Sequence, residues 1–214
     1  GMLAGLQILA LTDHNSTANC PAFFHAAETV GVIPVAGMEL ETAENIHVVC
    51  LFGTLSGAMS FGDEVAERRF PIKNRPEIYG EQLIVDHEDN ILGTDPKLLV
   101  VATGIGLTEV PEMVDRHGGV CYPAHIDRPS NGIIAILGDI PPDFPTKCAE
   151  LNDMSKRGEM IKSRPSLSGK RFLSGSDAHR LDAIRDAEHT IYLDGDSPDE
   201  IRKNLVKSIK LGRI

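Results

Sequence analysis

Seven ionisable side chains stand at or beside the ends of short apolar runs in this chain. They are Asp13, His14, Glu39, His47, His125, Asp177 and His179. Imidazole and carboxylate ligands together suit Zn, Mn or Fe ions, and the absence of a cysteine among them argues against a structural zinc knot. In α/β folds such groups collect at strand ends, because the rigid sheet holds them while solvent can still reach them. The pattern therefore predicts a divalent metal site at one edge of a sheet.

The spacing of these residues suits hydrolysis assisted by more than one metal ion. Glu39 carries two carboxylate oxygens, which could bridge two cations. Asp177 and His179 are two residues apart, so on a continuing strand they would share a face and serve neighbouring ions. Two metals about 3.5 to 4 Å apart can hold a hydroxide for in-line attack and stabilise the leaving oxygen.

A structural explanation exists for each residue taken alone. Asp13 or Asp177 could cap a helix, and Glu39 could pair with Arg128. Several further ionisable residues are interpreted as structural or solvated: His25, His87, His117, His189, Glu41 and Glu44. The metal interpretation is preferred because four separate strand ends would otherwise all be polar by accident.

Composition narrows the class of protein. The chain has 214 residues and 42% hydrophobic content, enough for one domain with a full core. The chain has 21 Lys and Arg residues and 31 Asp and Glu residues. The resulting net charge of −10 disfavours sequence-independent binding of nucleic acid. No apolar run approaches the roughly 20 residues that cross a bilayer, and no signal-type segment is visible, so we expect a cytoplasmic protein without a membrane partner. The cysteines show no CxxC spacing and are predicted to be buried, reduced thiols.

Apolar runs separated by turn signals predict alternating strands and helices. We expect strands at 7–11, 33–38, 46–52, 120–124, 149–151, 171–175 and 190–193. We expect helices at 17–30, 56–69, 133–137 and 197–208, and another between Thr108 and Gly118. Residues 1–214 are predicted to form a single domain, with an inserted helix and hairpin at about 56–95. Buried, mostly parallel strands with many strand-end ligands favour an α/β barrel over an open sheet.

The order of the motifs resembles the PHP superfamily, named for polymerase and histidinol phosphatase. The matching segments are LTDHN at 11–15, GMELE at 37–41, His47, PAHIDRP at 123–129 and GSDAH at 175–179. The resemblance spans nearly the whole chain. It implies a distorted (β/α)7 TIM-like barrel with a site for up to three metal ions, and hydrolysis of phosphoesters through a metal-bound hydroxide.

The resemblance also implies a role for each residue. Glu39 looks like a carboxylate that bridges metal ions, with His47 and His125 as its partners at one ion. Asp177 is expected to share a second ion with Glu39. The remaining roles are a third ion at His14 and His179, substrate contacts from Asn15 and Arg128, and a supporting catalytic role for Asp13. Zn, Mn or Fe are the expected cofactors.

One family feature is absent from this sequence. Family members open with a His-x-His pair on a first strand, followed by a helix, whereas this chain begins almost at the second strand. Only the ion at Glu39, His47 and His125 keeps its full set of matched ligands, so we expect fewer than three ions. A gene start placed too far downstream is the favoured explanation, and a natural short chain with a binding or regulatory role is the other. The open barrel edge is expected to be covered by the segment 209–214 or by a second subunit in a homo-oligomer.

The sequence therefore predicts a metal-dependent phosphoesterase that acts on a phosphate ester of a small metabolite or nucleotide. A catalytically impaired metal-binding scaffold is one alternative. A proofreading nuclease is the other, and the acidic charge and the lack of a basic region make it less favoured.

Overall fold

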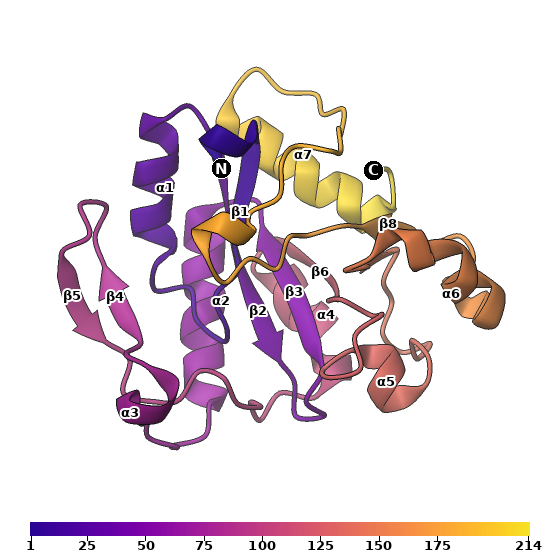
Figure 1. The fold of residues 1–214 in the computed structure, drawn as a ribbon, viewed down its shortest axis with the longest axis horizontal. Coiled ribbons are helices and arrows are strands. Elements are labelled where there is room, and N and C mark those ends of the chain that lie inside the picture. The colour runs from indigo at the N-terminus through magenta and orange to yellow at the C-terminus, as the bar shows by residue number, and fades with distance from the viewer.

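The computed structural model describes residues 1–214 (Figure 1). The strands are β1 Ile8–Leu11, β2 Ile33–Glu41, β3 His47–Phe52, β4 Leu83–Val85, β5 Ile91–Thr94, β6 Gly119–Pro123, β7 Cys148–Glu150 and β8 Arg171–Leu173. The α-helices are α1 Cys20–Thr29, α2 Leu55–Arg68, α3 Pro76–Tyr79, α4 Val110–Arg116, α5 Ile133–Leu137, α6 Arg157–Ser163 and α7 Pro198–Leu211. Single 3-10 turns are η1 Met2–Ala4, η2 Leu107–Glu109, η3 Met154–Lys156, η4 Pro165–Leu167 and η5 Leu181–Ala183.

The main sheet has four strands in the order β1-β2-β3-β6. β1 and β2 are parallel, whereas β3 is antiparallel to both β2 and β6. The expectation of a parallel strand is therefore wrong at β3. Only residues 42–46 join β2 to β3, and a parallel crossover needs a dozen residues or more. As a result, the end of β2 and the beginning of β3 lie at the same edge of the sheet.

The strand ladders do not form the predicted distorted (β/α)7 barrel. β7 and β8 make a separate parallel pair, and a single backbone hydrogen bond from Ile126 to Glu150 links β7 to the segment after β6. On the other side, β1 pairs only with β2, and a cavity lies between β1 and residues 174–189. The fold is thus an open mixed sheet with two small satellite ladders.

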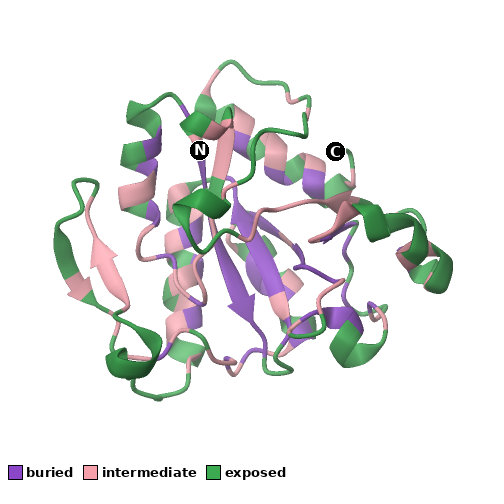
Figure 2. Ribbon diagram, viewed as in Figure 1, coloured by how far each residue is buried: buried purple, intermediate pink, exposed green.

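Helices cover both faces of this sheet, and β2 and β3 are buried between them (Figure 2). On one face, Ala58 and Phe61 of α2 belong to a 25-residue core cluster. On the other, Val206 and Ile209 of α7 pack in a second cluster with residues of β2, β3, β6 and β7. The prediction that the C-terminal segment covers an open edge is therefore wrong, because α7 lies on a face of the sheet. Near the β1 edge, the backbone of Ala187 instead donates to Ala4.

Several local predictions are confirmed. Ser197 accepts a hydrogen bond from the Glu200 amide and so caps α7, and Pro111 lies in the first turn of α4. The β4–β5 hairpin forms, and all four cysteines are free, although Cys121 is only half-buried. The strand expected at 190–193 is absent, and Tyr192 is 93% exposed, because its β-prone residues have no neighbouring strand edge to pair with. No helix combines the length and hydrophobicity needed to cross a bilayer.

Candidate metal centre

Side chains from three neighbouring strands converge at one edge of the main sheet. Glu39 lies near the end of β2, His47 begins β3, and His125 follows the end of β6. These three side chains are 8%, 13% and 2% exposed, respectively. The short antiparallel turn between β2 and β3 is the reason that a residue from the end of one strand meets a residue from the start of the next.

The ligand atoms of these three residues lie at nearly equal distances from one another. Glu39 Oε1 is 3.0 Å from His47 Nδ1 and 3.1 Å from His125 Nε2, and the two nitrogens are 3.2 Å apart. Ligands held tetrahedrally at about 2.0 to 2.1 Å from a zinc ion are separated by roughly 3.3 Å. The three atoms therefore match one face of a coordination sphere, and the residues fit a divalent metal ion.

His14 adds a fourth ligand from beyond the end of β1. Its Nδ1 atom is buried without a hydrogen-bond partner and lies 3.6 Å from Glu39 Oε2. One ligand atom each from His14, Glu39 and His47 lies within 4.8 Å of the other two. An isolated parallel bridge between His14 and Glu39 continues the β1–β2 pairing and holds His14 in place. We call Glu39, His47, His125 and His14 the imidazole cluster.

The charges of the imidazole cluster are strongly coupled. Burial opposes the charge of Glu39, but hydrogen bonds from His125 and His47 hold the pKa of that carboxyl well below its usual range. Burial also opposes the charge of His47, yet hydrogen bonds to Glu39 and Glu41 raise its pKa to about 9. For His14, burial outweighs the attraction of Glu39 and lowers the pKa. A metal ion would therefore have to displace a proton from His47 but not from His14.

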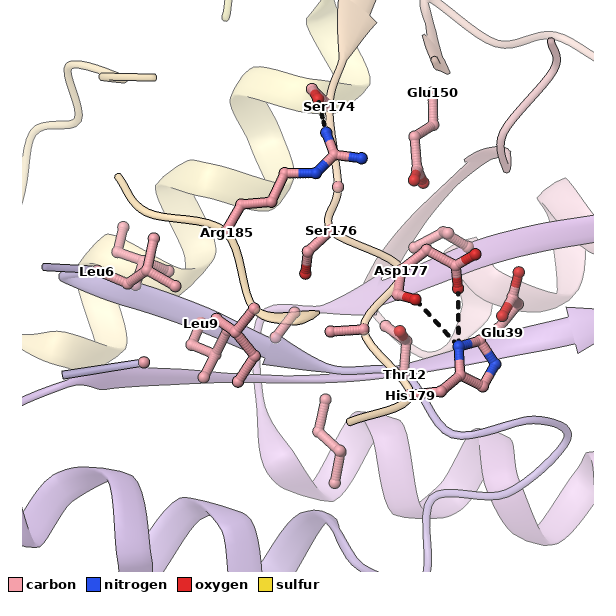
Figure 3. A pocket seen from close by; sticks show the side chains of 18 of the residues that line it. Leu6, Leu9, Thr12, Glu39, Glu150, Ser174, Ser176, Asp177, His179 and Arg185 are labelled. Atoms are coloured by element: carbon pink, nitrogen blue, oxygen red, sulfur yellow. Dashed lines mark hydrogen bonds and ion pairs between the residues drawn. The ribbon is translucent and has the colours of Figure 1, made fainter. Parts of the chain in front are cut away.

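Asp177 and His179 approach the same cavity from the segment that follows β8 (Figure 3). Asp177 Oδ2 is 2.6 Å from Arg128 Nη1, and Asp177 Oδ1 is 3.6 Å from His179 Nδ1. The ring centroids of His179 and His14 are 5.8 Å apart. The side chain of His179 is 64% exposed, so this residue lies at the rim rather than on the floor. Five of the six predicted metal ligands thus line this cavity, and the sixth, His47, contacts Glu39.

Three non-glycine residues near the site adopt left-handed backbone conformations. They are Asn15 at φ 49°, His125 at φ 24° and Asp177 at φ 46°. Such conformations are strained for residues with a Cβ atom, and they persist where the surrounding structure enforces them. Here each follows a strand end and turns the chain at the edge of the cavity.

Asp13 and Asn15 have partners within the protein. The Asp13 carboxylate accepts a hydrogen bond of 3.5 Å from Asn19, and burial raises its pKa. Asn15 is 1% exposed and donates to the carbonyls of Leu99 and Val101 while accepting from the Glu41 amide. Asn15 thereby ties two loops to the end of β2. A substrate contact from Asn15 stays a prediction and would require these hydrogen bonds to be exchanged.

Two acidic residues at the site were not among the predicted ligands. Glu41 was interpreted as a solvated loop charge, yet it ends β2, is 7% exposed and lies 3.7 Å from His47 Nε2. Its two-residue spacing from Glu39 could have revealed it, because such residues share a face of a strand. Glu150 ends β7, is 6% exposed and lines the cavity. A three-residue strand is too short for its alternation to show which way Glu150 points.

Searches against protein-family models and against curated proteins find no match. Among solved structures, the lesion-specific endonuclease EndoQ of Pyrococcus furiosus aligns with a TM-score of 0.59 and 19% identity, covering 96% of this chain and 48% of that chain. A proposed metal-dependent phosphoesterase of Bifidobacterium adolescentis aligns with a TM-score of 0.55 and 17% identity, covering 95% of this chain and 87% of that one. The chain thus spans about half of the endonuclease. At these identities the alignments show that this chain shares its fold with both structures.

Proposed function

We propose that this protein is a metal-dependent phosphoesterase whose catalytic ion is held by the imidazole cluster. The observation that carries the proposal is the mutual spacing of 3.0 to 3.2 Å among ligand atoms of Glu39, His47 and His125. A divalent ion at such a position lowers the pKa of a water molecule and polarises a phosphoryl oxygen.

The protein groups around the cluster supply the other requirements of phosphoester hydrolysis. Glu39 and His125 are buried, so the ligand atoms are shielded from bulk water and their electrostatic interactions are strengthened. Arg128 is 41% exposed and pairs with Asp177 through one terminal nitrogen. The fork of its guanidinium suits a phosphate group, and its exposure beside Asp177, which lines the cavity, leaves it accessible to one.

The cavity favours a small phosphorylated substrate. It has a volume of about 900 Å³ and is bordered by β1, the imidazole cluster and residues 174–189. That volume is typical of pockets that bind metabolites. The net charge of −10 weakens any general attraction for nucleic acid. Because the fold is similar to that of an endonuclease, an oligonucleotide is the alternative substrate to test beside a small phosphate ester.

Phosphatase assays with Mn²⁺ or Zn²⁺ test this proposal. We expect the protein to hydrolyse nucleotides or small phosphate esters faster than a single-stranded oligonucleotide, and the Glu39→Ala variant to lose that activity. Glu67→Gln, an exposed change on α2, is the matched control. Equal turnover by the native protein and Glu39→Ala would refute the proposal. Metal binding without any hydrolysis would instead identify a scaffold, and preferential cleavage of the oligonucleotide would identify a nuclease.

A further inference from the structure

We propose that His25 and His87 form a surface site for a transition-metal ion such as Zn²⁺, which fastens the β4–β5 hairpin to α1. His25 lies on α1, and His87 lies in the turn between β4 and β5. The hairpin runs beside α1 at one side of the molecule (Figure 1). Neither histidine lines the cavity of the imidazole cluster, so this site is separate from the one to which the proposed function is assigned.

The first observation is that the two imidazole rings contact each other across two separate elements. Their centroids are 3.8 Å apart, and the ring planes are inclined by 48°. Both residues are exposed, so burial in the core does not force the rings together. Two neutral imidazoles placed this closely can share one ion, and imidazole is the commonest metal ligand in proteins.

The second observation is that neither ring is occupied by a partner within the protein. Five of the eight histidines pair with a carboxylate, namely His14, His47, His117, His125 and His179. His25 and His87 pair with none, and each has the other ring as its neighbour. The exposed acids Glu28, three residues after His25 on α1, and Glu88, next to His87, add a local attraction for a cation. The ring nitrogens are therefore available to an ion.

The third observation is that the backbone on both sides of the pair is fixed. His25 lies in the middle of α1, a helix of 10 residues. In the turn that carries His87, the Asp86 carboxylate accepts hydrogen bonds from the amides of Glu88 and Asn90 at 2.9 and 3.0 Å, and from the Asn90 side chain at 2.9 Å. Ligands that the fold already holds in place lose less conformational entropy when an ion binds.

The chemistry of the pair determines the kind of ion. Imidazole nitrogens suit Zn²⁺, Ni²⁺ and Cu²⁺, whereas Mg²⁺ and Ca²⁺ prefer oxygen ligands. In the imidazole cluster, the rings of His47 and His125 are 5.2 Å apart and their facing nitrogens are 3.2 Å apart. The rings of His25 and His87 would separate from 3.8 Å toward that value on binding, which rotation of two exposed side chains allows. Water molecules would complete the coordination of such a surface ion.

An ion at this pair would fix the hairpin at a second point. At the start of β4, the side chain of Asn19 donates to the Leu83 carbonyl and accepts from the Val85 amide. The histidine pair lies at the other end of β4, where no hydrogen bond joins the hairpin to α1. The hairpin also borders a second cavity of about 290 Å³, which Asp13 and His14 line from the other side. The ion would therefore steady one wall of a cavity that adjoins the imidazole cluster.

The test uses Cu²⁺ bound to nitrilotriacetate, a chelate that leaves two coordination positions open and is too bulky for the buried imidazole cluster. Electron paramagnetic resonance measures its binding to the full 214-residue chain. We expect the native protein to bind the chelate, and both His25→Ala and His87→Ala to bind it at least about tenfold more weakly. His189→Ala removes another exposed histidine, and we expect it to bind like the native protein. Circular dichroism verifies that each variant is folded.

Hydrogen exchange with Zn²⁺ tests whether the ion fastens the hairpin. We expect Zn²⁺ to slow the exchange of the β4 and β5 amides in the native protein and to leave it nearly unchanged in His87→Ala. Three results would overturn the site: no bound chelate in the native protein, unchanged binding in His25→Ala or His87→Ala, or its loss in His189→Ala. Equal slowing by Zn²⁺ in the native protein and His87→Ala would overturn the fastening. None of these measurements involves hydrolysis, so they stand or fall independently of the proposed function.

Discussion

Glu39 of the imidazole cluster and Glu150 line one cavity, yet their pKa values are shifted in opposite directions. In the imidazole cluster, Glu39 has histidine partners at 3.0 and 3.1 Å, and its pKa is lowered despite burial. Glu150 is equally buried, has acidic neighbours, and has its pKa raised to about 8. Burial alone therefore does not decide the protonation of an acid at this site. The charge of the nearest partners does.

The two acids therefore differ in what compensates their charge when no metal is bound. Within the imidazole cluster, Glu39, His47 and His125 lie within hydrogen-bond distance of one another when no metal is bound. Glu150 has no such internal partner and depends on a proton or a cation. Four predictions, from the largest expected effect to the smallest, test this difference.

Removing the carboxylate of Glu39 should have the largest effect on metal binding. We expect Glu39→Gln to lower the affinity for a divalent ion by more than about 100-fold, because even residues that only support metal ligands contribute 10- to 100-fold. Calorimetric titration with Mn²⁺ measures this, with Glu67→Gln as the control. Native-like affinity in Glu39→Gln would show that the imidazole cluster does not hold the ion.

Metal binding to the imidazole cluster should depend on pH. Because the pKa of His47 is raised to about 9 in the absence of metal, a metal ion must displace its proton at neutral pH. We expect the apparent affinity to rise by about tenfold per pH unit between roughly pH 7 and 8.5, as titration in a series of buffers would show. In Glu41→Gln this rise should level off at a lower pH, since Glu41 helps to raise the pKa of His47. An apparent affinity that does not change with pH would contradict the proton displacement from His47.

Glu150→Gln should raise the thermal stability of the metal-free protein at high pH. The folded-state pKa of Glu150 lies above its usual value of 4.5, so its contribution to stability is present below pH 4.5 and is lost as pH rises toward about 8. At about 1.4 kcal/mol for each tenfold change in proton affinity, the penalty at pH 8.5 amounts to several kcal/mol. We expect Glu150→Gln to melt on the order of 5 to 10 °C higher at pH 8.5 and close to the native temperature at pH 4.5.

Thermal melts in a chelating buffer measure this difference. Glu188→Gln should leave the melting temperature unchanged at both pH values, because the side chain is exposed. A lower melting temperature for Glu150→Gln at pH 8.5 would mean that the native carboxylate has a stabilising partner.

The rim histidine should have the smallest effect. His179 is 64% exposed, whereas His125 is 2% exposed and contacts Glu39 directly. We expect His179→Ala to weaken divalent-ion binding by less than about tenfold and His125→Ala to weaken it by more than about 100-fold. Parallel titrations compare the two variants, and equal losses would place His179 on the floor of the site.

Much of the site could be predicted from the sequence because its ligands lie at the ends of recognisable apolar runs. The runs that carry Glu39, His47 and His125 form strands or end in them, and the three side chains meet. Whether the strands curve into a barrel could not be predicted, because apolar runs do not specify which strand edges pair. For the same reason the β-prone residues at 190–193 form no strand.

The sequence by itself determined which residue types stand at the strand ends, and hence that a site rich in imidazole and carboxylate would form. It also determined the direction of β3, since five residues between β2 and β3 are too few for a parallel crossover. Only the tertiary structure decided that Glu150 joins the site, because its position depends on the backbone hydrogen bond from Ile126 and on the space left by Gly175. The tertiary structure also decided which acid is charged, since protonation follows from burial and from partners distant in the chain.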